Sequence, residues 1–283
     1  MIKMIKCKFC NKKIKRKQIC YNFKENKLNG AFYHCDKCKI FFNNKIVKEK
    51  IYTRNIKNLN VSNKNLLYYL KTLFLIFFYL KIKKFFLKNK NSILDFGAGS
   101  GELTNLLVFF KNNTFATDFD FNKYNYSKKI KFLKFKNLFK KNNNNKFDII
   151  VMRHVLEHIL EFEKLINKLK KILKKKTGTL IIEVPNYNSF WINILGEKWP
   201  GFFYPYHHYV FSEKFLKKKI IEHGLKLIKI NKAEPPIFGT FFYSIGLGRI
   251  LSKILSVIFY PIQILISKIT CKSEALILFF KND

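Results

Sequence analysis

The chain has 283 residues, 48% of them hydrophobic, which is enough to bury the core of one full α/β domain plus a small additional segment. Its formal net charge of +37 favours anionic partners. Only four of the 55 basic residues are arginine, however, and arginine is the side chain whose planar fork matches phosphate. Abundant Lys, Asn, Ile and Phe are what an AT-rich coding sequence produces. Nucleic acid is therefore the less favoured partner.

Residues 1–42 contain two C-x-x-C pairs, formed by Cys7, Cys10, Cys35 and Cys38. This is the spacing of a zinc ribbon, in which four thiolates hold one tetrahedral ion. The segment is too short and too rich in lysine to build a core without such a staple. We therefore expect a structural zinc ion without a catalytic role, with Cys20 and His34 as spare ligands. Disulfides and a ribbon without metal are the alternatives.

Residues 43–90 are expected to form a polar connector followed by one apolar helix over 64–88. The centre of this helix is apolar all round, but flanking lysines keep the apolar run below the roughly 18 residues that a membrane span needs. We expect the helix to pack on a sheet or to cover the active site, and membrane contact is the alternative. The first residues do not have the form of a secretory signal. These features predict a cytoplasmic protein, or one held peripherally at the inner face of a membrane.

A glycine-rich loop follows a short apolar segment that ends at Asp95. Its glycines occupy alternate positions, Gly97, Gly99 and Gly101, and a helix is expected to start directly afterwards. Because glycine has no Cβ, the backbone can approach a ligand closely, and a loop between a strand and a helix N-terminus typically cradles a nucleotide-like cofactor. The dinucleotide pattern G-x-G-x-x-G does not fit, because position 102 is glutamate.

A second short apolar segment ends about twenty residues later at Asp118, with Asp120 in reserve. In doubly wound sheets an acid at the end of the second strand holds the ribose hydroxyls of a nucleoside. Alternating strand and helix patterns over 91–283 then predict an α/β, doubly wound, mostly parallel sheet of seven strands. The strands are expected to end or lie near Asp95, Thr117, 130–136, Val151, Val184, 225–230 and 275–280.

The region at about 233–272 is an apolar insertion before the last strand. We expect two short amphipathic or apolar helices here, with Pro261 breaking or kinking the long apolar stretch 250–269. Packing against the core and a platform for a membrane surface or a lipid substrate are the two main interpretations. A transmembrane span is disfavoured because the chain must return to complete the sheet.

The pattern D-x-G-x-G-x-G resembles motif I of the class I S-adenosylmethionine-dependent methyltransferases. Residues 147–158 are similar to the fourth strand and following helix of that superfamily, with the pattern FDxIxxxxVLEH. The resemblance covers about residues 90–232 plus the last strand. It is closest to the group that includes the ubiquinone-pathway O-methyltransferases and methyltransferases of glycan-biosynthesis clusters, many of which carry a similar C-x-x-C ribbon.

The resemblance implies methyl transfer to a small-molecule, sugar or lipid-linked acceptor. An RNA methyltransferase that uses the ribbon and the lysines is an alternative, although its usual Asn/Asp-Pro-Pro-Tyr segment is replaced here by residues 152–155. A non-catalytic zinc-ribbon binding protein is the third interpretation. The cofactor residues implied by the resemblance are Asp95, Gly97, Ala98, Gly99 and Gly101 around the methionine part, Asp118 at the ribose, Asn137 at the adenine, and Arg153 and His154 at the methionine end.

On the acceptor side, residues 205–212 resemble the segment PxHxxxFS that lies beside the active site in this family. His207 is therefore the first candidate for a base or substrate contact, and the alternative is a histidine that fixes the loop. His154 and His158 are expected four residues apart on one helical face, where they could bind a metal but more commonly pack the helix on the sheet. Aromatic residues between 191 and 204 are expected to form a lid.

Overall fold

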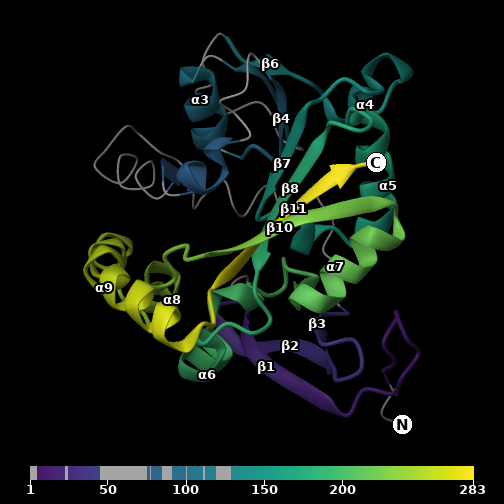
Figure 1. The fold of residues 1–283 in the computed structure, drawn as a ribbon. Coiled ribbons are helices and arrows are strands. Elements are labelled where there is room, and N and C mark those ends of the chain that lie inside the picture. Colours follow the sequence, from purple (N-terminus) through teal and green to yellow (C-terminus); the bar gives the residue numbers. More distant parts are fainter. Residues whose placement is uncertain are drawn as a thin grey trace.

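The computed structural model describes residues 5–22, 25–44, 75–76, 78–84, 91–99, 101–110, 112–118 and 129–283. Within these ranges the chain builds one β-sheet of seven strands and one of four, with helices packed around the larger sheet (Figure 1). Most of the expected connector and the ends of the predicted helix 64–88 lie outside the described residues. The described part of that helix, 75–76 and 78–84, is helical.

The seven-stranded sheet has the order β10-β11-β8-β7-β4-β5-β6. Its strands are β4 (Ser92–Phe96), β5 (Asn113–Thr117), β6 (Lys131–Phe132), β7 (Ile149–Arg153), β8 (Thr179–Pro185), β10 (Leu225–Ala233) and β11 (Ala275–Asn282). Neighbouring strands from β6 to β8 are parallel, and β11 runs antiparallel between β8 and β10. The predicted doubly wound, mostly parallel sheet is confirmed.

Helices cover both faces of this sheet, so its central strands are buried on both sides, as is usual in parallel sheets. On one face α3 (Glu102–Phe109) and residues 75–84 pack through Leu75, Phe78, Ile82 and Leu107 on alternate strand residues. On the other face lie α5 (Phe162–Ile172) and α7 (Glu213–Glu222). The described part of the predicted apolar helix therefore packs on the sheet.

The small sheet has the order β1-β2-β3-β9 and joins two distant parts of the chain. Its strands are β1 (Arg16–Asn22), β2 (Lys27–Cys35), β3 (Ile40–Phe42) and β9 (Tyr209–Phe211). Antiparallel pairing places Ile40 opposite Phe211 and Phe42 opposite Tyr209. Phe9 also packs against Phe162 and Phe215, with ring centroids 6.0 Å and 4.9 Å away. The cysteine-rich segment is thus bonded to the body of the molecule.

The insertion forms α8 (Phe238–Ser244) and α9 (Arg249–Thr270). The prediction of two short helices, with a break or kink at Pro261, is wrong for the second helix. This helix, α9, is long and runs without interruption for 22 residues. An interior proline costs about 3 kcal/mol, but the residues on both sides of it are anchored. Tyr260 donates to the carbonyl oxygen of Glu234 over 2.9 Å, and Gln263 donates to that of Pro235 over 2.7 Å.

The remaining helical segments are short and lie in the connections between strands. They are α4 (Phe135–Leu138), α6 (Trp191–Leu195) and the 3₁₀ turns Lys141–Asn143, Leu156–His158, Gly196–Lys198 and Pro200–Phe202. Several of them sit where the parallel strands end. In doubly wound folds that edge of the sheet is where ligands bind.

Candidate cofactor and acceptor site

The glycine-rich loop after β4 is fixed to the end of β5 by three backbone N–H groups. Those of Gly97 and Ala98 donate to the carbonyl oxygen of Thr117 over 2.9 and 3.1 Å. The N–H of Gly99 donates to Oδ2 of Asp118 over 2.8 Å. The predicted loop and the predicted ribose-binding acid are therefore side by side at the carboxyl ends of two neighbouring parallel strands.

All three glycines of this loop have positive φ angles that disfavour other residues, and that of Gly101 is 84°. Gly97 has φ 78°, and a Cβ placed on it would lie 2.4 Å from Cγ2 of Val155. Gly99 has φ 54°, but a Cβ there would meet no atom of the described chain within 4 Å. Gly97 thus packs against protein, whereas Gly99 faces open space beside Asp118. Gly101 caps α3, whose N-terminus also points at this space. The arrangement fits a bound nucleoside.

Asp95 ends β4 beneath the loop and is 2% exposed. Its Oδ2 accepts from the hydroxyl of Thr104 over 2.6 Å, which ties the strand to α3. Burial raises the pKa of this carboxyl to about 7. Asn137 lies in α4, just past the end of β6, and is half-buried. The reserve candidate Asp120 lies outside the described residues.

Arg153 and His154 lie where β7 ends. The Nε of Arg153 is 2.6 Å from Oε2 of Glu183, and its guanidinium lies 5.3 Å from the ring centre of Phe78. His154 has φ 52° and precedes the 3₁₀ turn 156–158. The expectation that His154 and His158 share one helical face is therefore wrong, because the chain turns sharply at His154 before any helix begins. The Nδ1 atom of His154 instead lies 3.3 Å from Oε1 of Glu157.

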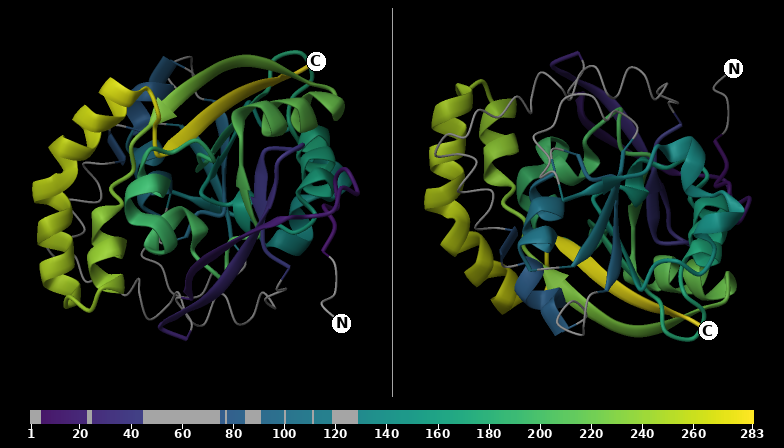
Figure 2. Two further views of the ribbon diagram at one scale, coloured as in Figure 1. Left: turned by 90° about the horizontal axis from the view of Figure 1, so that it is seen from below. Right: turned by 90° about the horizontal axis from the view of Figure 1, so that it is seen from above.

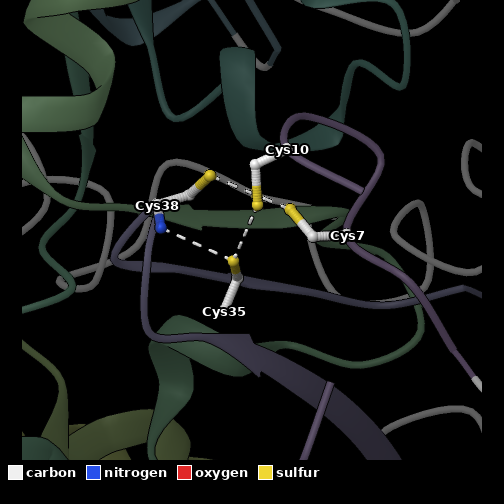
Figure 3. Close-up of side chains that lie close together, drawn as sticks. All are labelled: Cys7, Cys10, Cys35 and Cys38. Atoms are coloured by element: carbon white, nitrogen blue, oxygen red, sulfur yellow. Dashed lines mark hydrogen bonds between the residues drawn. The ribbon is translucent and has the colours of Figure 1, made fainter. Parts of the chain in front are cut away.

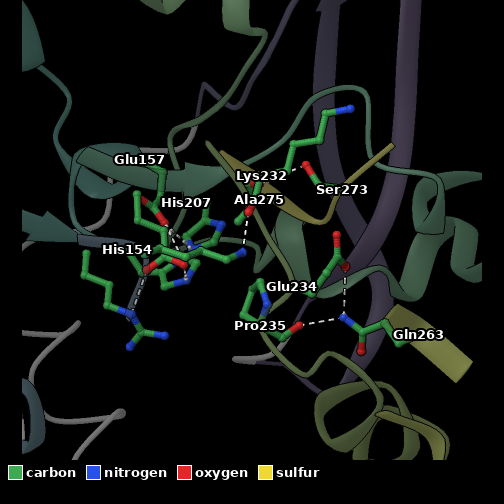
Figure 4. Close-up of polar contacts among 12 residues, drawn as sticks. His154, Glu157, His207, Lys232, Glu234, Pro235, Gln263, Ser273 and Ala275 are labelled. Carbon is green, nitrogen blue, oxygen red and sulfur yellow. Dashed lines mark hydrogen bonds and ion pairs between the residues drawn. The ribbon is translucent and has the colours of Figure 1, made fainter. Parts of the chain in front are cut away.

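A buried carboxylate, Glu157, lies among histidines at this edge of the sheet (Figure 4). The Nδ1–H of His207 donates to the carbonyl oxygen of Gly201 over 2.8 Å. Its Nε2 therefore carries the lone pair, 4.0 Å from Oε1 of Glu157. Ligand atoms of Glu157, His158 and His207 lie within 4.8 Å of one another, so these three residues could hold a metal. Within the described chain, Oε2 of Glu157 has no hydrogen-bond partner.

Burial lowers the pKa of His158 and of His207 to about 3. Both histidines are therefore neutral in the folded protein and are protonated near pH 6.5 in the unfolded chain, so they destabilise the fold as the pH falls below about 6.5. Asp95 and Glu274 have the opposite effect on stability. Burial raises the pKa of these carboxyls to about 7 and about 8, so the folded protein binds protons that the unfolded chain releases, and these two groups stabilise the fold as the pH falls.

We therefore expect the unfolding free energy of the parent protein to depend more strongly on pH than that of the double variant His158→Gln/His207→Gln. Between about pH 7 and about pH 5, the parent should lose on the order of 1.4 kcal/mol of unfolding free energy per pH unit and per histidine relative to the variant. Urea unfolding at both pH values measures this. Equal pH dependence in the two proteins would show that the histidines titrate normally in the fold.

The aromatic segment after β8 is anchored by a residue that the sequence analysis did not single out. Glu274, 3% exposed, accepts from Oγ of Ser189 over 2.6 Å and from Nε1 of Trp199 over 3.0 Å. Trp199 and Phe202 pack with Phe32 of the small sheet. The predicted lid is thus a fixed wall packed against the small sheet. The only feature of the sequence that points to Glu274 is its position as a lone acidic residue directly before an apolar strand.

The four cysteines of the C-x-x-C pairs point toward one another (Figure 3). The Sγ atoms of Cys7 and Cys38 are 3.9 Å apart, and those of Cys10 and Cys35 are 3.6 Å apart. A disulfide would require about 2.05 Å, whereas four thiolates around one tetrahedral zinc ion at about 2.3 Å lie about 3.8 Å apart. The donor set therefore fits zinc. Cys20 is buried in another cluster, and His34 is ion-paired with Asp36.

A doubly wound sheet with a glycine loop and an acid at neighbouring strand ends defines a nucleoside-binding α/β enzyme fold. A methyltransferase domain model matches residues 72–230, more than half of the chain. The chain belongs to this methyltransferase domain family and is a class I S-adenosylmethionine-dependent methyltransferase.

Two solved structures share the fold. The 1,6-didemethyltoxoflavin-N1-methyltransferase of Burkholderia thailandensis, solved with 1,6-didemethyltoxoflavin and S-adenosylhomocysteine, is 10% identical with a TM-score of 0.50, over 89% of this chain and 96% of that one. A S-adenosylmethionine-dependent methyltransferase of Thermotoga maritima is 15% identical with a TM-score of 0.50, over 83% and 99%. No curated protein matches the chain.

Proposed function

We propose that this enzyme methylates a small-molecule, sugar or lipid-linked acceptor, of the kind used in cell-surface glycan or quinone-type biosynthesis. The observation that carries the proposal is the position of the His207–Glu157 pair. It lies at the same edge of the sheet as the glycine loop, beside the buried aromatic wall around Trp199. The rings of Trp199 and Phe202 are buried, so they fix the loop that carries His207 and hold the pair in position.

The cofactor would be held by the residues that line the open space at Gly99. When bound, S-adenosylmethionine supplies an electrophilic methyl group on a sulfonium. Asp118 would accept from the ribose hydroxyls, Asn137 would contact the adenine, and the loop from Gly97 to Gly101 would follow the methionine part. Arg153 and His154 would lie toward its methionine end. The main contribution of the protein is then alignment of the acceptor with the methyl group.

For a hydroxyl acceptor, His207 would accept the proton that leaves the oxygen. Its Nε2 carries the lone pair because Nδ1–H is donated to Gly201. The carboxylate of Glu157, 4.0 Å from this nitrogen, would stabilise the imidazolium that forms. Because burial lowers the pKa of His207 to about 3, the base is available throughout the physiological pH range.

We assign the zinc at the four cysteines a structural role, since four thiolate ligands leave no open position. The ion would hold the segment that carries Phe9 and β3 against the rest of the molecule. We place the protein in the cytoplasm. Nucleic acid remains a less favoured partner, because only four of the 55 basic residues are arginine.

The proposal is tested by incubating purified, zinc-replete protein with labelled S-adenosylmethionine and a panel of nucleotide sugars, polyprenyl-linked sugars and quinone precursors. Label transfer to a member of the panel supports it. Transfer only to RNA would overturn the acceptor class.

With an acceptor in hand, His207→Gln should lower kcat by about 100-fold or more, in the range of general base catalysis, and leave the affinity for S-adenosylhomocysteine unchanged. The parent should show no loss of kcat between about pH 8 and about pH 5, because a base with a pKa near 3 stays unprotonated there. A matched control is His223→Gln at the C-terminal cap of α7. An unchanged kcat in His207→Gln would show that His207 only fixes the loop.

A further inference from the structure

Helix α9 has its polar and apolar faces reversed relative to a helix of a water-soluble protein. Its buried side chains include the polar residues Ser252, Ser256, Gln263 and Ser267. The large apolar side chains that it exposes are Ile250, Leu251, Ile254, Val257, Ile258, Ile262, Leu265 and Ile269. Seven of these are more than 45% exposed. In water the apolar stripe of an amphipathic helix faces the core, so this exposed stripe needs an apolar environment to cover it.

The contact between α8 and α9 combines the rings of Phe238, Phe242 and Phe259 with small and hydrogen-bonded residues. A Cβ on Gly239 would lie 3.4 Å from Ser256, so the two helices approach closely at this point. Gln263 accepts from the backbone N–H of Ile237 over 3.3 Å and donates to the carbonyl oxygen of Pro235. Helix pairs in membranes associate through small residues and polar side chains in this way, which leaves their large apolar side chains for lipid.

The hairpin of α8 and α9, residues 234–274, leaves the large sheet at the carboxyl ends of its parallel strands, where the cofactor loop also lies. Ala275, the first residue of β11, pairs with Ala233 at the end of β10 and with Pro185 at the end of β8. Both views of Figure 2 show α9 as the outermost element on its flank. Whatever covers α9 therefore lies on the side of the molecule where the parallel strands end.

The shape of the hairpin indicates that it lies in a membrane surface and does not cross the bilayer. Residues 250–270 are long and apolar enough for a span, with a mean hydropathy of 1.8 and 22% burial. However, α8 has 7 residues, about 10 Å in length, and packs along α9 through Phe238, Phe242 and Phe259. The chain also enters β11 four residues after α9 ends.

The charge of the hairpin complements an anionic surface. Residues 235–273 contain four basic residues, Arg249, Lys253, Lys268 and Lys272, and no acidic residue. Lysines near the ends of an interfacial helix can reach phosphate head groups while its apolar face enters the acyl boundary. A second protein chain would need only an apolar patch, whereas an anionic bilayer matches both the apolar stripe and the four basic residues between Glu234 and Glu274.

We propose that the α8–α9 hairpin docks the enzyme on an anionic lipid bilayer, with the stripe of α9 from Ile250 to Ile269 buried at the boundary between head groups and acyl chains. This goes beyond the proposed function, because it does not depend on the acceptor. It places the carboxyl ends of the parallel strands beside the lipid surface.

Co-sedimentation with vesicles tests the proposal. Full-length zinc-replete protein should bind phosphatidylcholine vesicles that contain phosphatidylglycerol, bind pure phosphatidylcholine vesicles more weakly, and lose part of its binding when salt is added. The triple variant Ile254→Glu/Ile258→Glu/Ile262→Glu should bind at least about tenfold more weakly, because carboxylates cannot enter the acyl boundary. The matched control is Ile19→Glu/Ile221→Glu/Ile228→Glu, which places the same three charges on exposed isoleucines outside the hairpin and should bind much as the parent does.

Binding of S-adenosylhomocysteine by all variants shows that they are folded, and it reports on the cofactor site independently of lipid. Absence of vesicle binding by the folded parent would overturn the proposal, and so would equal binding by the triple variant of α9. Light scattering tests the remaining alternative, in which another copy of the chain covers the stripe of α9. If the parent is a dimer, the triple variant of α9 a monomer and neither binds vesicles, a second copy of the chain covers the stripe.

Discussion

Asp118→Ala should weaken binding of S-adenosylhomocysteine by at least about 100-fold. An ionised carboxylate that accepts from two ribose hydroxyls makes two charge-assisted hydrogen bonds, each worth about 1.5–3 kcal/mol, and 1.4 kcal/mol is a factor of ten. The substitution also removes the acceptor for the N–H of Gly99, 2.8 Å away, so the loop loses one of its three hydrogen bonds to the end of β5. Calorimetric titration measures the effect.

Asp118→Asn separates the two roles of this side chain. Its amide oxygen can still accept from Gly99, while its charge and one acceptor oxygen are lost. We expect an intermediate loss of about tenfold. Glu222→Ala, which removes a carboxylate from the far end of α7, is the control for net charge and should bind normally. Parent-like binding by Asp118→Asn would contradict the assignment to the ribose.

Replacing Cys38 with serine should release zinc and reduce methyl transfer while leaving the cofactor site intact. The freed segment carries β3, which pairs with β9 directly after His207 and His208, and Phe32, which packs on the aromatic wall. Loss of a structural metal should lower the Tm by about 10 °C. Affinity for S-adenosylhomocysteine should change by less than about threefold, since the glycine loop and Asp118 belong to the other sheet.

Metal analysis, thermal unfolding and titration measure these three effects. Cys271→Ser is the matched control, because this thiol is exposed and lies outside the cluster. It should keep one zinc ion per chain and the parent Tm. A folded parent that carries no zinc when purified without chelators, or that contains two disulfides, would contradict the assignment.

The sequence predicted the large sheet because its signals are local. Apolar runs of strand length alternate with helical patterns, and the glycines of the cofactor loop sit directly after the strand that ends at Asp95. The proximity of Asp118 to Gly99 followed from the same rule, since the carboxyl ends of neighbouring parallel strands lie at one edge. The C-x-x-C spacing likewise predicted four converging thiols.

Other parts of the site depend on contacts between residues far apart in the sequence. The strand β9 has three residues and becomes a strand only because β3 supplies its partner. The role of Glu274 depends on Ser189 and Trp199, which are 85 and 75 positions away. The continuity of α9 through Pro261 depends on anchors on Glu234 and Pro235. Local patterns carry no information about such pairings.

The pairing of β3 with β9 also sets an order of events during synthesis. If zinc occupies the four cysteines as proposed, a nascent chain can bind it and form β1, β2 and β3 long before residues 209–211 leave the ribosome, because domains form from the N-terminus onward. Until then the edge of β3, with Ile40 and Phe42, is unpaired and able to bind another strand. Translation that ends before residue 209 therefore leaves a metal-bound fragment with an open apolar edge, which is a substrate for chaperones and a seed for aggregation.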